Sequence, residues 1–200
     1  WQKENQSFID DAEVEVQRRK TAGWQLSLKH KEYIGRSTLD IGLGYKRGTG
    51  MADAIAAPEE VFDEDTSRMK VITADISYNH PFQIGRQHFV YDTDLHAQWN
   101  KTPLMPLDKI AIGGRYTVRG FDGESSLSAE RGWYWRNEAG WYFQAAHQFY
   151  LALDGGHVSG DSAQYLLGQT LIGAAAGLRG QFKAGGSLNY DLFAGKPIKK

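Results

Sequence analysis

The sequence predicts an all-β protein, an antiparallel β-sheet of about nine strands that forms part of a transmembrane β-barrel. Apolar and polar residues alternate with a period of two through most of the chain, which is typical of strands with one apolar face. Trp and Tyr are frequent at the apolar positions, and short connections alternate with long ones. No segment shows a helical period of convincing length, so the apolar face of the sheet must be covered by lipid or by a second sheet.

The clearest strand is expected at 87–99, where the apolar face runs from Phe89 to Trp99. At about 3.3 Å per residue, this strand is long enough to cross a bilayer at a tilt. An aromatic residue stands at each end of its apolar face, as the interfacial girdles of such barrels require. The full set of expected strands is 12–20, 23–30, 37–46, 69–79, 87–99, 131–144, 147–154, 166–180 and 185–195.

The connections between these strands fall into two length classes. Tight connections are expected at 21–23 and 81–85, and long ones at 47–67, 100–130 and 155–165. Short periplasmic turns that alternate with longer outer loops are typical of outer-membrane barrels.

Composition excludes several classes of protein. The 200 residues include no cysteine, which excludes a disulfide scaffold and a cysteine-ligated metal site. The net charge of −1 gives no argument for a nucleic-acid partner. No apolar run approaches the roughly 20 residues that a membrane-spanning helix needs. The chain begins at Trp1 without a signal peptide, so we expect its start to lie inside a longer gene product.

A soluble β-sandwich that serves as a binding module is the alternative fold. Such a sandwich would usually have shorter strands than those expected here. The number of strands with one apolar, aromatic-rich side favours lipid as the covering layer.

The loop at 100–130 is unusually long and carries an apolar core. It contains Tyr116, Val118 and Phe121, which indicates that its tip packs inside another part of the protein. Segment 170–179 is poor in bulk on one face, which indicates either close approach of another element or a sharply curved strand.

The stretch 114–138 carries the most specific motif of the chain. Its elements are Val118-Arg119-Gly120-Phe121, Arg131-Gly132 and Arg136-Asn137-Glu138. This combination resembles the inward-folded loop and following strand of bacterial two-partner secretion transporters, the TpsB family, which shares its barrel with the BamA insertases. Phe121 stands where that family frequently has tyrosine, which removes one hydroxyl.

The resemblance implies a sixteen-strand outer-membrane barrel of which residues 1–200 form the C-terminal part, with 100–130 as the inward-folded loop. The POTRA modules and the last strand of the family are expected to lie outside this chain. The implied function is export of a large unfolded exoprotein of the TpsA type, such as a haemolysin, an adhesin or a contact-dependent toxin. The implied partners are this exoprotein and outer-membrane lipid, with no catalysis, cofactor or metal and a monomeric intact protein. A BamA-like barrel assembly insertase is the alternative that shares the loop motif.

In the TpsB family the motif arginine contacts an acidic residue on the inner wall of the barrel. Residues 149–156 resemble the family's strand motif that ends in Asp-x-Gly, so we expect Arg119 to pair with Asp154, and with Glu138 as second choice. Period-2 alternation agrees, because it places both carboxylates opposite their apolar, lipid-facing neighbours. A buried arginine without a carboxylate would be costly. The other interpretation of Arg119 is a solvated loop charge.

No catalytic constellation emerges from the remaining polar residues. The six histidines show no metal-ligand spacing. Ser159, His157 and Asp154 are close in sequence, but they lie in a Gly-rich segment that offers no oxyanion donor, so a barrel enzyme is not expected. Charges expected to hydrate the inner wall are Glu13, Glu15, Lys29, Asp40, Asp75, Asp92, Asp94 and Asp191.

Overall fold

The computed structural model describes residues 2–5, 8–9, 12–13, 19–56, 66–121, 126–183 and 185–199. Nine strands form one antiparallel sheet in the order β1-β4-β5-β6-β7-β10-β11-β12-β13, which confirms the predicted all-β class and strand number. The strands of this sheet are β1 (Gln2–Asn5), β4 (Arg19–Ile34), β5 (Ser37–Thr49), β6 (Lys70–Ile84), β7 (Gln87–Asn100), β10 (Arg131–Gln144), β11 (His147–Ser159), β12 (Thr170–Lys183) and β13 (Ser187–Lys199). Within the described ranges, β1 pairs only with β4 and β13 only with β12, so the sheet is open.

Two small hairpins and two short 3₁₀ helices complete the described structure. The hairpins are β2 (Phe8–Ile9) with β3 (Ala12–Glu13), and β8 (Ile110–Ile112) with β9 (Leu127–Ala129). The helices are η3 (Pro106–Asp108) and η4 (Asp161–Tyr165). Neither is long and apolar enough to span a membrane, and the described residues contain no other helix.

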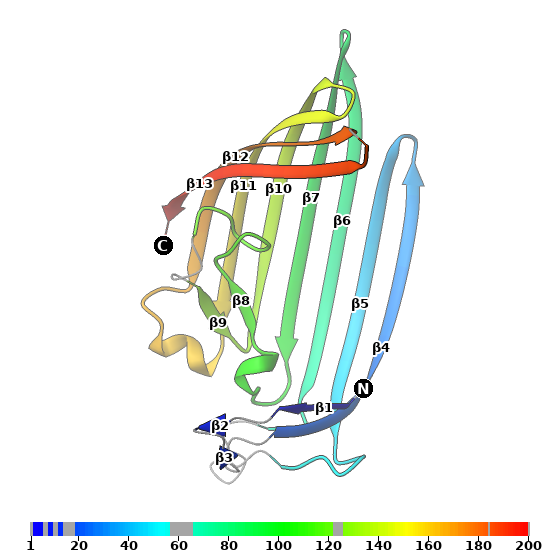
Figure 1. Ribbon diagram of the computed structural model, residues 1–200. Helices are drawn as coiled ribbons and strands as arrows, with labels where there is room; N and C mark the ends of the chain where they lie inside the picture. The colour runs from blue at the N-terminus through cyan, green and yellow to red at the C-terminus, as the bar shows by residue number, and fades with distance from the viewer. Residues whose placement is uncertain are drawn as a thin grey trace.

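Alternation along the strands separates two faces of the sheet. In β11, Tyr150, Ala152 and Asp154 are buried, whereas Leu151 and Leu153 are each 55% exposed. The exposed face carries large apolar side chains on every long strand, among them Trp24, Leu26, Leu28, Leu43, Ile76, Trp99, Trp133, Trp135, Leu151, Leu153, Leu178 and Leu192. The opposite, inner face carries the loop that connects β7 to β10 (Figure 1).

The connections sort by length as the sequence predicted, with short turns at one end of the sheet and long connections at the other (Figure 1). Two expected tight turns are misplaced. The expected turn at 21–23 is wrong, because Thr21 and Ala22 pair with β1 inside a continuous β4. The expected connection at 81–85 shortens to a turn at Gly85 and Arg86, and β6 continues through Pro81. Pro81 pairs with Val90 of β7 but lies beyond Asn79, the last β6 residue that pairs with β5, so it stands where β6 has a neighbouring strand on one side only.

Two other boundaries differ from the prediction. Strand β11 continues to Ser159, so the long connection expected at 155–165 lies at 160–169, and β12 begins at Thr170 rather than at 166. The strand expected at 12–20 lies largely outside the described residues.

Candidate functional site

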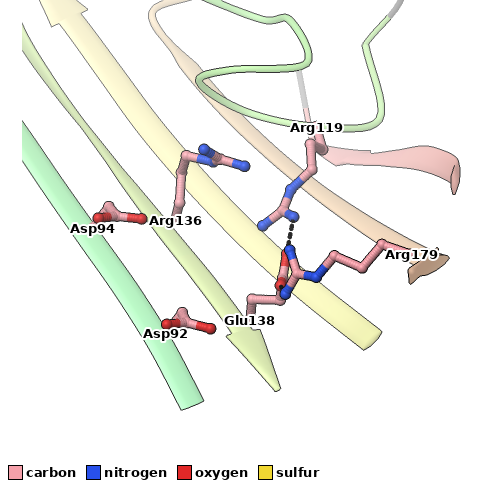
Figure 2. A pocket seen from close by; sticks show the side chains of 6 residues that line it. All are labelled: Asp92, Asp94, Arg119, Arg136, Glu138 and Arg179. Carbon is pink, nitrogen blue, oxygen red and sulfur yellow. Dashed lines mark hydrogen bonds and ion pairs between the residues drawn. The ribbon is translucent and has the colours of Figure 1, made fainter. Parts of the chain in front are cut away.

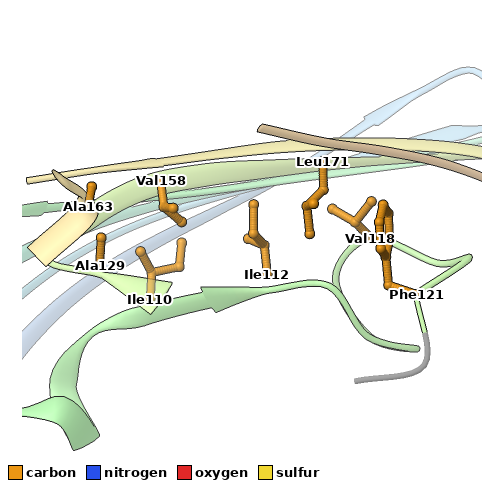
Figure 3. Close-up of a cluster of buried hydrophobic side chains, with 8 residues drawn as sticks. All are labelled: Ile110, Ile112, Val118, Phe121, Ala129, Val158, Ala163 and Leu171. Atoms are coloured by element: carbon orange, nitrogen blue, oxygen red, sulfur yellow. The ribbon is translucent and has the colours of Figure 1, made fainter. Parts of the chain in front are cut away.

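The loop between β7 and β10 packs its apolar side chains onto the inner face of the sheet. Figure 3 shows side chains of β8 and the loop tip opposite Val158 of β11 and Leu171 of β12. The complete buried cluster is Ile110, Ile112, Val118, Phe121, Ala129, Val158, Ala163 and Leu171. Val118 is fully buried and Phe121 is 8% exposed, so these two apolar residues lie inside the protein as predicted. Tyr116, which was expected to pack with them, is instead 76% exposed.

Backbone contact brings the loop tip close to β12 and β13. Gly120 adopts a φ of +97°, which L side chains rarely adopt, and its Cα lies 2.8 Å from where a Cβ on Gly195 would be. A Cβ on Gly173 would lie 1.9 Å from the carbonyl oxygen of Arg119. The low bulk of 170–179 therefore reflects close approach of another element, the loop tip itself.

At this loop tip, the guanidinium of Arg119 binds two carboxylates. Its Nε donates to Asp154 Oδ2 at 2.6 Å, and its Nη2 donates to Asp154 Oδ1 at 2.8 Å. Its Nη1 donates to Glu138 Oε2 at 2.5 Å. The backbone N–H of Arg119 donates to Asp154 Oδ2 as well, at 3.0 Å. The two candidate acids thus bind the same arginine together, rather than one in place of the other.

All three side chains are almost removed from solvent, with exposed fractions of 4% for Arg119, 0% for Asp154 and 9% for Glu138. Burial by itself lowers the pKa of the Arg119 guanidinium, but the hydrogen bonds that it donates to Asp154 and Glu138 outweigh burial and raise that pKa above its ordinary value. The guanidinium therefore stays charged, and its charge is balanced within the site.

A second arginine extends the site along the inner face of the sheet. Arg179 of β12 donates to Glu138 Oε1 and to Gln148 Oε1, and its guanidinium lies 4.8 Å from the ring centre of Tyr150. We call Arg119, Glu138, Asp154 and Arg179 the arginine cluster. The sequence did not single out Arg179, although period-2 alternation from Gly173 places it on the inner face.

Beside the arginine cluster lies a cavity of about 360 Å³. Figure 2 shows Asp92 and Asp94 on β7 and Arg136 on β10 facing the same space as Arg119. Asp92 accepts a hydrogen bond from Asn79 and Asp94 accepts one from Ser77. Arg136 has a buried Nε without a hydrogen-bond partner, and no ion pair joins its guanidinium to another described residue. This part of the inner face therefore carries charges of both signs. In the arginine cluster these charges are paired, and all of its members are buried except Arg179, which is 36% exposed.

The base of the loop is fixed by a separate polar contact that sequence reasoning missed. Lys109 Nζ lies 3.1 Å from Glu130 Oε1, and the Ser162 N–H donates to Glu130 Oε2 at 3.2 Å. Burial alone raises the pKa of the Glu130 carboxyl, but the hydrogen bonds from Ser162 and Lys109 outweigh burial and leave that pKa lowered. No sequence signal joins these residues, because Lys109 and Glu130 lie near opposite ends of one loop and Ser162 lies in another.

The other motif residues lie along β10. Arg131 is exposed at its start, and Gly132 leaves no space for a side chain beneath the carbonyl of His157. Asn137 donates its backbone N–H to Asp154 Oδ1 at 3.3 Å. The trio of Asp154, His157 and Ser159 forms no triad, because Asp154 binds Arg119 and His157 Nδ1 bonds with Thr170 Oγ1.

The comparisons with known proteins agree with this geometry. The family model described as haemolysin secretion/activation protein ShlB/FhaC/HecB matches residues 1–180. The chain belongs to this family. The resemblance to two-partner secretion transporters is thereby confirmed.

Individual ShlB/FhaC/HecB relatives match nearly the whole chain. The chain is 36% identical over 196 residues to the outer membrane transporter CdiB-2 of Burkholderia pseudomallei, which covers 97% of this chain and 34% of that protein. The solved structure of CdiB from Acinetobacter baumannii superposes with a TM-score of 0.83 at 34% identity, over 99% of this chain and 34% of that one. CdiB from Escherichia coli has the same fold, with a TM-score of 0.81 at 24% identity over 96% of this chain and 35% of that one. The chain thus spans about one third of the length of the relatives it matches.

Proposed function

We propose that this chain is the C-terminal part of a barrel that serves as the outer-membrane pore of a two-partner secretion system. One observation carries the proposal: a loop of this ShlB/FhaC/HecB-family chain is held on the inner face of an open sheet by a buried arginine. The exposed face of the same sheet carries the large apolar side chains that contact with lipid requires. A barrel completed by the rest of the protein would place the loop in the lumen.

The arginine cluster sets the working position of the loop inside this pore. Removing Arg119 would leave Asp154 and Glu138 buried with fewer donors, and an unpaired buried carboxylate is strongly unfavourable. The loop tip therefore stays on the wall as long as this charge pairing is intact. Translocation needs no catalytic group, since the pore supplies a path and a gate rather than chemistry.

The exported partner is an unfolded exoprotein of the TpsA type. A contact-dependent toxin is the most specific candidate for this exoprotein. Extended polypeptide carries charges of both signs, and the wall beside the arginine cluster presents both signs as well. The intact transporter acts as a monomer in this proposal, because a closed barrel leaves no sheet edge to pair with another copy.

The test is secretion by the full-length protein that carries Arg119→Ala. Secreted exoprotein is measured in the medium, and folded barrel is measured by its gel mobility before and after heating. Arg119→Ala is expected to reduce secretion more than it reduces the amount of folded barrel. Arg115→Ala is the matched control, because Arg115 lies in the same loop and its ion pair with Asp191 is 48% and 39% exposed.

Unchanged secretion by Arg119→Ala would refute the assigned role of the loop tip. If cells that carry Arg119→Ala secrete the exoprotein normally but insert other outer-membrane proteins poorly, the BamA-like insertase would be favoured instead. A full-length protein that folds without detergent or lipid would favour a soluble binding module.

A further inference from the structure

Asn137 is a polar residue on a face of β10 that, beyond Arg131 at the start of the strand, is otherwise apolar and aromatic. Its neighbours on that face include Trp135 and Trp141, which are 48% and 39% exposed, whereas Arg136 and Glu138 turn to the inner face. In the proposed barrel, Asn137 therefore lies on the lipid side. An amide in lipid is costly unless its hydrogen bonds are satisfied, and leucine would be the less costly residue there.

The side chain of Asn137 is satisfied by the two neighbouring strands. Its Oδ1 accepts from Tyr91 Oη at 2.7 Å and from Thr93 Oγ1 at 2.9 Å, both on β7. Its Nδ2 donates to the carbonyl oxygen of Leu153 on β11 at 3.2 Å. One side chain thus ties three adjacent strands together from the outer face.

The backbone of the same residue contacts the arginine cluster. The Asn137 N–H donates to Asp154 Oδ1 at 3.3 Å, and the Asn137 carbonyl accepts from Arg119 Nη2 at 3.4 Å. These bonds are long, so small shifts of β10 relative to β11 would break them. Asn137 is paired directly with Leu153, the residue before Asp154, so its position controls how the peptide groups of β10 meet that carboxylate.

We propose that Asn137 is a positioning residue for the Arg119–Asp154 pair. Its amide fixes β10 between β7 and β11 from the lipid side, and this holds the Asn137 peptide groups at the distance at which they bind Asp154 and Arg119. The inference rests on the proposed function, since both the lipid side and the role of the loop come from it. It adds a residue that acts on the loop from the opposite face of the wall.

The experiment is a double-mutant cycle in the full-length protein. Asn137→Leu is made alone and together with Arg119→Ala, and the thermal unfolding midpoint is read from gel mobility of heated samples. Trp141→Phe is the matched control, because it removes an outer-face hydrogen bond of the same strand, from Trp141 Nε1 to Gln87 Oε1 at 2.8 Å, away from the arginine cluster. Tyr91→Phe, which removes one hydroxyl from Asn137 Oδ1, is run in the same cycle in case Asn137→Leu does not fold.

Asn137→Leu is expected to lower the midpoint by roughly 2–4 °C, and by less than half as much when Arg119 is already alanine. Trp141→Phe should have the same small effect in both backgrounds. Equal effects of Asn137→Leu in both backgrounds, or no effect in either, would overturn the inference. Secretion measured in parallel keeps the two proposals separate: normal secretion by Arg119→Ala refutes the assigned role of the loop, while the thermal coupling still decides the role of Asn137.

Discussion

The inner faces of two parts of the same sheet differ in how far their charged side chains are exposed to solvent. Beneath the loop, Glu138 of β10 and Asp154 of β11 are buried together with Arg119, and Asp154 has no exposed side-chain surface. On β4 and β5, away from the loop, Lys31 and Asp40 form an ion pair at 3.1 Å while 50% and 44% exposed, so both charges stay hydrated. The same period-2 pattern places the charges of both regions on the inner face of the sheet. Alternation therefore determines the face on which a charged side chain lies, and coverage by the loop determines whether that side chain is buried.

This difference predicts unequal energies for similar contacts. Removing one partner of a buried ion pair leaves an uncompensated charge in a medium of low polarity. Removing one partner of an exposed pair leaves a charge that water solvates.

The largest effect is expected for Asp154→Ala. It removes the carboxylate that accepts three bonds from Arg119, and should lower the free energy of unfolding by about 3–5 kcal/mol. Asp75→Ala on β6 is the counterpart, since Asp75 pairs with His96 while 59% exposed, and should cost about 0–1 kcal/mol. Thermal or denaturant unfolding of the full-length protein in detergent measures both. Similar losses would show that loop burial does not distinguish the two walls.

The next effect concerns space rather than charge. Gly173→Ala places a Cβ 1.9 Å from the Arg119 carbonyl oxygen, a backbone atom that cannot rotate away. Overpacking of this kind should cost about 1–3 kcal/mol and displace the loop tip. Gly42→Ala on β5 introduces the same methyl group at an ordinary 3.5 Å from Asp75 Cβ, and should cost little or nothing. Loop displacement can be followed by protease sensitivity, and a Gly173→Ala protein with an unchanged loop would contradict the close contact.

Sequence reasoning located the faces of the strands but not the depth of burial on them. Alternation correctly placed Leu151 and Leu153 opposite Asp154, because side-chain direction in a strand depends only on parity. The Arg119–Asp154 contact followed from a motif rather than from spacing. The bond from Arg179 to Glu138 depends on the register of β10, β11 and β12, which a local pattern does not specify.

Strand ends were harder to predict than strand faces. The segment 21–23 contains small residues that favour a turn, yet pairing of β4 with β1 keeps it extended. Pro81 resembles a strand end, but it remains in β6 because β6 extends past the pairing with β5 there and is paired only with β7. Both outcomes depend on neighbours that are distant in sequence, so local propensity could not predict them.

A smaller effect is expected at the base of the loop, and it depends on pH. The pKa of Glu130 is lowered below its ordinary value of 4.5, so its contribution to stability is present at neutral pH and is lost as the pH falls below 4.5 through the folded-state pKa. Glu130→Gln should lower the free energy of unfolding by about 1–2 kcal/mol at pH 7. The difference from the unchanged protein should vanish in acid. Unfolding midpoints measured from pH 7 to pH 3 test this, and a constant difference across that range would contradict the assigned ionisation.

The smallest effect is expected for Lys31→Ala on the hydrated wall. Its partner Asp40 is 44% exposed, so water replaces the ammonium group when it is removed, and ordinary salt already screens the pair. The unfolding midpoint of the full-length protein should not change measurably, at either low or high salt. A loss that disappears at high salt would mean that water solvates Asp40 less well than its exposure indicates. The two walls would then differ in how their charges are arranged rather than in hydration, and the loop would no longer be what separates them.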